Sequence, residues 1–250
     1  MQPRTRTVTS LFAAAALLIL PVHGPNAAES VAAQSLATAP YVPATTLNAE
    51  PSPVDPRFGS SELRLVVPFR TQKDGGKWQT SNCGPATLGM LLDGYGINGF
   101  ETDDLRVRAH TYQGTVGMRT GTGLDHVVHV AEDLGLTAHG LYAPDGAFRR
   151  WDVADVTAEL RQGRPVMPLV RLYQVPGYEG VAQRWGHYIL LTGFAPGGFY
   201  FSDSLKTEAG PGTTAIISEA QLTAALASSH IPGQAVAFSG PLALAIWQPD

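Results

Sequence analysis

Apolar residues follow two different periods along this chain, which predicts a domain with a helical half and a β half. Between residues 83 and 162 the apolar positions recur at intervals of three and four, the spacing of one helix face. Between residues 165 and 203 short β-branched and aromatic runs are separated by Gly and Pro, which is typical of strands. We therefore expect an α+β fold with helices packed on an antiparallel sheet.

The predicted helices are bounded by residues that favour helix ends. They cover 83–95, 102 to about 110, 122–135, 152–162 and 218–229. Thr102 and Thr122 are the expected N-caps of the second and third helices. Asp103 and Asp104 occupy the first turn of the second helix, and we interpret them as solvated charges that the helix dipole favours. The first helix is expected to be amphipathic, with an apolar stripe made of Leu88, Leu91 and Leu92.

The predicted strands bring two polar residues together at one end of a hairpin. They cover 63–69, 165–172, 186–194, 199–203 and 242–247. The third and fourth of these segments flank a Pro-Gly-Gly turn and therefore predict an antiparallel hairpin. His187 begins the first strand of this hairpin and Asp203 ends the second. Because those two ends are neighbours in an antiparallel pair, the imidazole and the carboxylate are expected to meet.

The N-terminus has the features of a secretory signal. Arg4 and Arg6 precede a short apolar run followed by small residues, so we predict a signal peptide over 1–28 with cleavage between positions 27 and 33. A Pro- and Ala-rich segment, 29–60, is predicted to be a linker, and 61–250 a single domain. The protein is therefore expected to be secreted or associated with the cell envelope, without a stable membrane span once the signal is removed.

The charge distribution argues against nucleic-acid binding, and the histidine spacing gives no complete metal site. The formal net charge is −4, and without residues 1–28 the balance is 15 basic against 21 acidic residues. Since the basic residues are dispersed among acidic ones, no nucleic-acid partner is expected. His126 and His129 have a spacing that can bind a metal, but no third or fourth ligand stands near them in the sequence. No metal or cofactor is expected.

Cys83 is the only cysteine, so in an exported chain it cannot close an intramolecular disulfide. It stands at the start of the first predicted helix, where the helix dipole and free backbone N–H groups favour a thiolate. This position predicts a nucleophile, and the alternative is a small buried apolar side chain. His187 would be its base and Asp203 the group that orients the base. The backbone N–H of Cys83 is one expected oxyanion donor.

A second oxyanion donor is expected from one of two glutamines. Gln72 precedes an Asp-Gly-Gly turn, and Gln79 lies closer in sequence to the cysteine. Sequence separation does not decide between them, because the loop can fold back by an unknown amount. Trp185, next to the His187 strand, is expected either to line a substrate cleft or to belong to the core.

Four ordered blocks carry a resemblance to a known family. They are Val67-Pro68-Phe69-Arg70-Thr71-Gln72, Asn82-Cys83-Gly84-Pro85-Ala86, Trp185-Gly186-His187-Tyr188 and the hairpin that ends at Asp203. The chain from about residue 64 to 206 resembles the papain-like cysteine peptidases of the C39-like family, related to the domains that remove double-glycine leaders from bacteriocin precursors. The resemblance implies a papain-like fold and a Cys, His, Asp triad at the positions named above, with Gln72 in the oxyanion hole.

Two departures limit what the resemblance implies about the substrate. The leader peptidases are usually fused to a membrane transporter, whereas this chain has no such segment after its signal. Asn82 stands where the leader peptidases often have an acidic residue. The substrate of those enzymes is therefore not expected to carry over.

The sequence thus predicts an exported cysteine hydrolase that cleaves peptide or amide bonds of a peptide or protein substrate through a thioester acyl-enzyme. Two alternatives stay open. One is a catalytically silent papain-fold module that binds peptides, and the other is a transglutaminase-like acyl transferase. Retention of all three polar triad residues favours the enzyme, since a binding module has no need of an imidazole aligned with a thiol.

Overall fold

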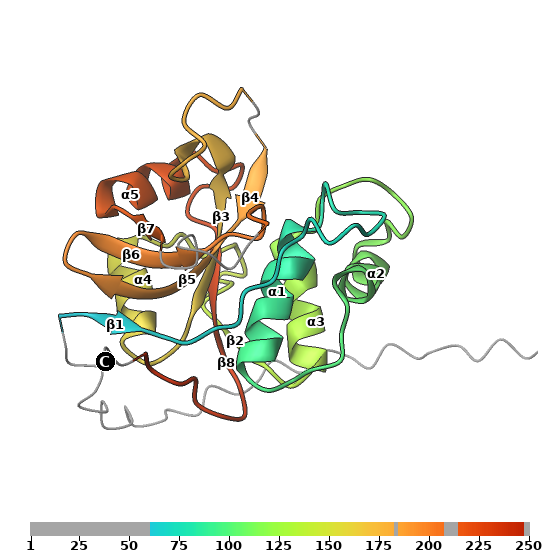
Figure 1. Cartoon of the computed structure of the whole chain (residues 1–250), viewed down its shortest axis with the longest axis horizontal. Coiled ribbons are helices and arrows are strands. Elements are labelled where there is room, and N and C mark those ends of the chain that lie inside the picture. The colour runs from blue at the N-terminus through green and yellow to red at the C-terminus, as the bar shows by residue number, and fades with distance from the viewer. Residues whose placement is uncertain (1–60, 183–184, 208–214, 248–250) are drawn as a thin grey trace, which may run out of the picture. The chain divides into compact units, whose positions relative to one another are not determined.

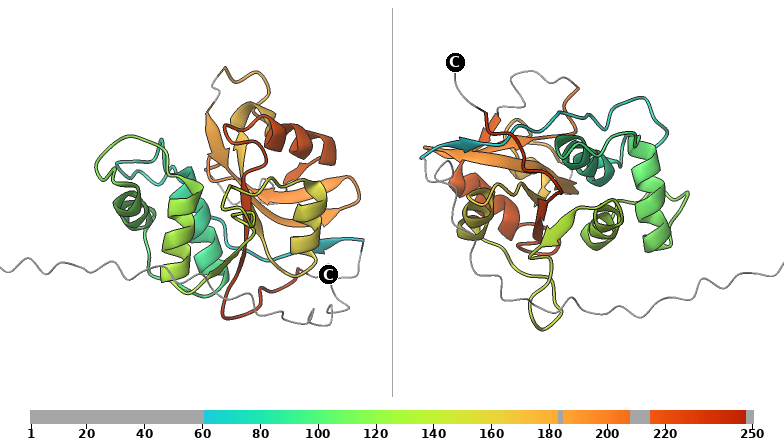
Figure 2. Two further views of the ribbon diagram at one scale, coloured as in Figure 1. Left: turned by 180° about the vertical axis from the view of Figure 1, so that it is seen from behind. Right: turned by 90° about the horizontal axis from the view of Figure 1, so that it is seen from below.

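The computed structural model describes residues 61–182, 185–207 and 215–247. The predicted signal peptide (1–28) and linker (29–60) lie outside these residues. Three helices, α1 (Cys83–Gly94), α2 (Thr102–Gln113) and α3 (Leu124–Asp133), gather to one side of an antiparallel sheet, as Figure 1 and both views of Figure 2 show. The predicted α+β architecture is confirmed.

The sheet carries the second half of the predicted site. Its strands among the described residues are β1 (Leu63–Arg64), β2 (Thr137–His139), β3 (Val166–Arg171), β4 (Gly186–Tyr188), β5 (Leu190–Ala195), β6 (Gly198–Ser202), β7 (Ala215–Ile217) and β8 (Ala235–Ser239). The order is β2-β8-β3-β5-β6-β7, while β1 pairs with β5 and β4 pairs with β3. Every one of these pairs is antiparallel.

Helices α4 (Val153–Leu160) and α5 (Glu219–Ala227) pack against β3 and complete the core, with a short 3-10 turn at Leu172–Gln174. Both begin where the sequence predicts. Asp152 and Ser218 each form a capping box, in which the cap side chain accepts from a backbone N–H and the third residue of the helix accepts from the N-cap backbone. No helix among the described residues has the length and apolarity needed to cross a membrane.

Helix α1 buries the predicted stripe of Leu88, Leu91 and Leu92, but it is buried on every side, so the prediction that it is amphipathic is wrong. All residues from Gly84 to Leu92 are buried. The helix lies between α2, α3 and β4, which leaves no face for solvent. A helix that is covered all round does not need a polar face, and small residues let its neighbours approach. The first residue of this helix, Cys83, is therefore fixed by core packing.

The two predicted threonine caps are also wrong. The N-cap of α2 is Glu101, and Thr102 is already inside the helix. The N-cap of α3 is Gly123, whose N–H donates to the side chain of Gln113. The hydroxyl of Thr122 instead lies 3.2 Å from Nε2 of His110. A tertiary partner thus takes the hydroxyl of Thr122 that the sequence suggests as a cap.

The predicted strand 186–194 divides into β4 and β5 at Ile189. In the register of β3, Leu169 pairs with Tyr188 and Val166 pairs with Leu191, which places Pro168 opposite Ile189. Proline has no N–H, so it cannot supply a ladder bond at that point. The hairpin from β5 to β6 is present as predicted, with Ala195 paired to Gly198 across the turn.

Strands 63–69 and 242–247 are shorter than predicted. Only Leu63–Arg64 forms a strand, and beyond it a single bridge joins Leu65 to Ile246. The central strand β8 was not predicted, because the alanines in its sequence have low intrinsic β propensity. Its pairing with β2 on one side and β3 on the other makes it a strand.

Candidate active site

The thiol stands at the junction of the helical half and the sheet. Cys83 is the first residue of α1, which packs against β4, the strand that carries His187. The first backbone N–H groups of a helix have no partner within it, so the thiol lies at a site that favours negative charge. The residues of α1 and β4 are far apart in sequence, and the packing of these two elements brings them together.

The predicted meeting of His187 and Asp203 is observed. Nε2 of His187 lies 2.7 Å from Oδ1 of Asp203, and both side chains are buried. His187 is held in β4 by pairing with Val170 of β3. Asp203 directly follows β6, and its Oδ1 also accepts from the N–H of Leu205 at 2.9 Å. Because Nε2 is engaged by the carboxylate, Nδ1 is the ring nitrogen left for the thiol.

The thiol and the imidazole shift each other's pKa in opposite directions. Burial by itself raises the pKa of the Cys83 thiol, but the hydrogen bond and charge of His187, with backbone N–H groups of Tyr188 and Gly84, outweigh it and lower that pKa. Burial lowers the pKa of His187, whereas the hydrogen bonds and charges of Asp203 and Cys83 raise it to about 9. Both shifts favour a thiolate and imidazolium pair near neutral pH.

Asp203 stays ionised although it is buried. Burial raises the pKa of this carboxyl, but His187, the N–H of Leu205 and the hydroxyl of Tyr178 lower it below its ordinary value. Tyr178 is near enough to act on the pKa, yet Oδ2 of Asp203 has no partner within hydrogen-bond distance among the described residues. The contact to His187 is therefore the dominant one for this carboxylate.

Gln72 lies in the same site and is held from two directions. Its Oε1 accepts from the hydroxyl of Ser204 at 3.0 Å, and its Nε2 donates to the carbonyl of Gln79 at 2.8 Å. Its backbone N–H donates to the carbonyl of Ser204, also at 2.8 Å. Gln72 lines the cavity beside Cys83, whereas Gln79 is not among the residues that line it. The geometry therefore favours Gln72 over Gln79 as a side-chain donor.

A buried arginine that sequence reasoning missed supports the turn before Cys83. Arg106 of α2 donates to the carbonyl of Ser81 at 3.1 Å and to Oδ1 of Asn82 at 3.3 Å. Asn82 in turn donates to Oδ1 of Asp103, so this half-buried carboxylate has a structural partner besides its place in the first turn of α2. Burial lowers the pKa of Arg106, against the opposing charges of Asp103 and Cys83. No local sequence signal marks this role, because α2 and the turn meet only in the folded chain.

The site opens into a cavity of about 470 Å³. Its lining residues come from both halves of the fold: Gln72, Thr80, Ser81, Cys83, Arg119, Gly121, Leu172, Trp185, Gly186, His187 and Leu205. Trp185 is 65% exposed, so of its two predicted roles it takes that of a cleft residue. A cavity that contains a thiol, an imidazole and an amide donor can hold an acyl group for attack.

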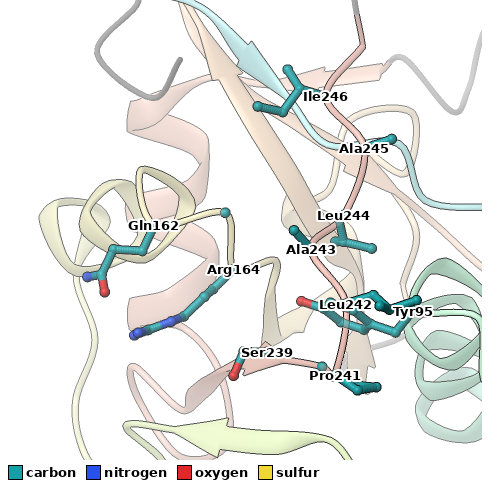
Figure 3. A pocket seen from close by; sticks show the side chains of 12 residues that line it. Tyr95, Gln162, Arg164, Ser239, Pro241, Leu242, Ala243, Leu244, Ala245 and Ile246 are labelled. Carbon is teal, nitrogen blue, oxygen red and sulfur yellow. The ribbon is translucent and has the colours of Figure 1, made fainter. Parts of the chain in front are cut away.

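A larger cavity of about 630 Å³ lies elsewhere, between the turn at residues 162–164 and the segment 240–246 that follows β8 (Figure 3). Tyr95, Arg164 and Ser239 line it with residues 240–246. It contains none of the predicted site residues, and Arg164 is paired with Glu159 at 2.9 Å. Chemistry and not volume therefore identifies the candidate active site.

The two histidines of α3 gather no further ligand in the described part of the chain. The ring centroids of His126 and His129 are 6.5 Å apart. No group of three or more His, Cys, Asp or Glu side chains suited to a metal occurs among residues 61–182, 185–207 and 215–247.

An α+β fold with a thiol at a helix start and a histidine–aspartate pair on the facing sheet defines the papain-like class of cysteine peptidases. The chain belongs to the Peptidase_C39 like family, whose model matches residues 64–224. This confirms the resemblance seen in the sequence. Membership of this family supports cysteine peptidase activity.

Two solved structures show what the chain is similar to. One is a protein from Bacillus anthracis described as a C39-like peptidase, with 14% identity, a TM-score of 0.48, and coverage of 71% of this chain and 97% of that one. The other is a double glycine motif protease from an AMS/PCAT transporter in complex with the leader peptide, with 18% identity, a TM-score of 0.43, and coverage of 71% and 94%. The comparison with curated proteins gave no significant match.

Proposed function

We propose that this protein is an exported cysteine hydrolase that cleaves peptide or amide bonds through Cys83, His187 and Asp203. One observation carries the proposal. The thiol whose pKa is lowered by His187 opens into a cavity, and that histidine is paired with a buried carboxylate at 2.7 Å. Such a constellation prepares a nucleophile, a base and an orienting group before substrate arrives.

In the first half of the reaction the proton of Cys83 rests on Nδ1 of His187. The thiolate attacks the substrate carbonyl and a carbon–sulfur bond forms. Gln72 Nε2 and the backbone N–H of Cys83 donate to the oxyanion. The carbon–nitrogen bond then breaks as His187 gives its proton to the leaving amine, which leaves a thioester on the enzyme.

In the second half water replaces the amine. His187 takes a proton from water, the hydroxide attacks the thioester carbonyl, and the same two donors hold the second oxyanion. The carbon–sulfur bond breaks, the carboxylic acid leaves, and His187 again shares its proton with the thiolate. Asp203 keeps the imidazole in the orientation that both halves need.

The test compares variants of the purified protein on a library of quenched-fluorescence peptides. We expect Cys83→Ala to lower kcat/KM by about a thousandfold or more, and His187→Gln to do the same. His139→Gln is the matched control, since His139 lies on β2 and contacts Ser239 outside the cleft. Cleavage by Cys83→Ala at the parent rate would exclude the assignment. Product masses that contain an added amine would identify an acyl transferase.

Export is part of the proposal and rests on the sequence of the first residues. We expect a mature chain that begins after a cut between positions 27 and 33. N-terminal sequencing of protein recovered from the medium or the envelope fraction checks this. An intact Met1 on protein found only in the cytosol would contradict it.

A further inference from the structure

The cleft that contains Cys83 has an unusual charge distribution. Apart from the thiol and His187, the charged side chain among the described residues that line it is Arg119, and no aspartate or glutamate is among those lining residues. The chain as a whole has more acidic than basic residues. A cleft of positive sign in such a protein indicates selection for a negative group.

The guanidinium of Arg119 has no structural partner among the described residues. Other arginines of the described chain have structural partners: Arg70 pairs with Asp93, and Arg164 with Glu159. None of the described residues gives Arg119 a hydrogen bond or an ion pair, and its side chain is exposed at the cleft. An arginine fork offers several donors in one plane, which suits a carboxylate.

The backbone on both sides of Arg119 is held in place. The buried guanidinium of Arg106 donates to the carbonyls of Met118 and Thr120, each at 2.8 Å. The same guanidinium donates to the carbonyl of Ser81, close to the nucleophile. One buried side chain therefore ties the loop that carries Arg119 to the turn that carries the thiol. Such anchoring fixes the exposed cation relative to the site of attack.

We propose that Arg119 makes this cleft select substrates that carry a carboxylate close to the bond that is cleaved. The inference rests on the proposed function, since it names a substrate class for the same site. The rest of the lining is largely apolar, with Leu172, Trp185 and Leu205, so the guanidinium is the group there that distinguishes an acidic from a neutral substrate. The carboxylate comes either from an Asp or Glu side chain or from the C-terminus of a peptide.

The first test measures how fast the thiol of Cys83 is alkylated by a charged and by a neutral reagent. Cys83 is alkylated with iodoacetate, which is an anion, and with iodoacetamide, which is neutral and of similar size. The ratio of the two rate constants reports the charge of the cleft. We expect Arg119→Gln to lower this ratio about threefold to fivefold, and Arg119→Lys to retain most of it. Arg150→Gln, at a different pocket, removes the same charge and should leave the ratio unchanged.

The second test measures binding without catalysis. Fluorescein-labelled peptides in which Glu or Gln is placed at each position in turn, with free or amidated C-termini, are titrated into the Cys83→Ala protein. Preference for Glu over Gln that disappears in Arg119→Gln identifies a side-chain carboxylate. A preference for the free over the amidated C-terminus that disappears in Arg119→Gln identifies a terminal carboxylate.

The outcomes separate this inference from the proposed function. A thiol that reacts with neither reagent in the native protein contradicts the hydrolase, and the binding test then decides the role of Arg119. An alkylation ratio that is the same in Arg119→Gln as in the parent, or that falls equally in Arg150→Gln, overturns the inference. Equal binding of Glu and Gln peptides and of free and amidated ends overturns it as well.

Discussion

Nε2 of His187 lies 2.7 Å from Oδ1 of Asp203, where both side chains are shielded from water. The pairing leaves Nδ1 for the thiol. Burial lowers the pKa of the imidazole, but the hydrogen bonds and charges of Asp203 and Cys83 together raise it to about 9. A carboxylate in that position stabilises the imidazolium without taking its proton. The orientation of the imidazole thus depends on Asp203, and its charge depends on Asp203 and Cys83 together.

Replacing that carboxylate by an amide should weaken the base. We expect Asp203→Asn to lower kcat about a hundredfold less than removal of the thiol does, because an amide can hold the ring but carries no charge. The pKa of His187 should fall, since the hydrogen bond and charge of Asp203 are among the causes that raise it. Peptide hydrolysis followed across pH measures both effects. An unchanged profile in a folded Asp203→Asn protein would count against the role of this pair.

Hydrolysis by the parent should follow a bell-shaped pH profile. Activity rises as pH climbs through the lowered pKa of Cys83, because the thiolate forms there. Activity falls again near pH 9, where His187 loses the proton that it must give to the leaving amine. Alkylation by iodoacetamide needs no acid, so its rate should rise on the acid side and show no alkaline fall. In His187→Ala both the early rise and the hydrolysis should disappear.

Ser204 should act on catalysis through Gln72. Its hydroxyl donates to Oε1 of Gln72, which leaves Nε2 to donate to the carbonyl of Gln79. We expect Gln72→Ala to lower kcat about a hundredfold. We expect Ser204→Ala to lower it roughly tenfold with little change in KM, since the amide then loses its fixed orientation.

A double-mutant cycle distinguishes this positioning role from a general loss of stability. Ser204→Ala should have almost no further effect on kcat once Gln72 is already alanine. Thermal unfolding of the same variants gives the stability part separately. Additive losses of kcat in the double variant would show that the two residues act independently.

Gly193 should be essential for the edge strand that precedes the site. A Cβ at this position would lie 2.0 Å from the carbonyl oxygen of Leu63, so β1 could not pair with β5. We expect Gly193→Ala to lower the free energy of unfolding by about 2 to 4 kcal/mol. Gly121→Ala is the control, because a Cβ there meets nothing within 4 Å. Denaturant unfolding of the two variants measures the difference, and equal stabilities would contradict the close approach.

Local patterns predicted the parts of the fold that local chemistry controls. The helices predicted over 152–162 and 218–229 begin close to those positions in the structure, where Asp152 and Ser218 form capping boxes. Thr102 and Thr122 carry the same kind of signal, yet neither caps a helix, because Thr122 faces His110 and Glu101 precedes α2 in the cap position. The strand β8 escaped prediction because pairing on both sides makes it a strand, and its own residues do not.

The sequence by itself determined which residues can supply a thiol, an imidazole and a carboxylate. A lone thiol at a helix start and a hairpin that joins His187 to Asp203 can both be recognised from short stretches of sequence. The tertiary structure alone decided that Gln72 and not Gln79 lines the cavity, that Arg106 ties the turn at Ser81 to the loop of Arg119, and that Trp185 faces solvent. These relationships join segments distant along the chain, and they form only when the burial of α1 against β4 brings the two halves together.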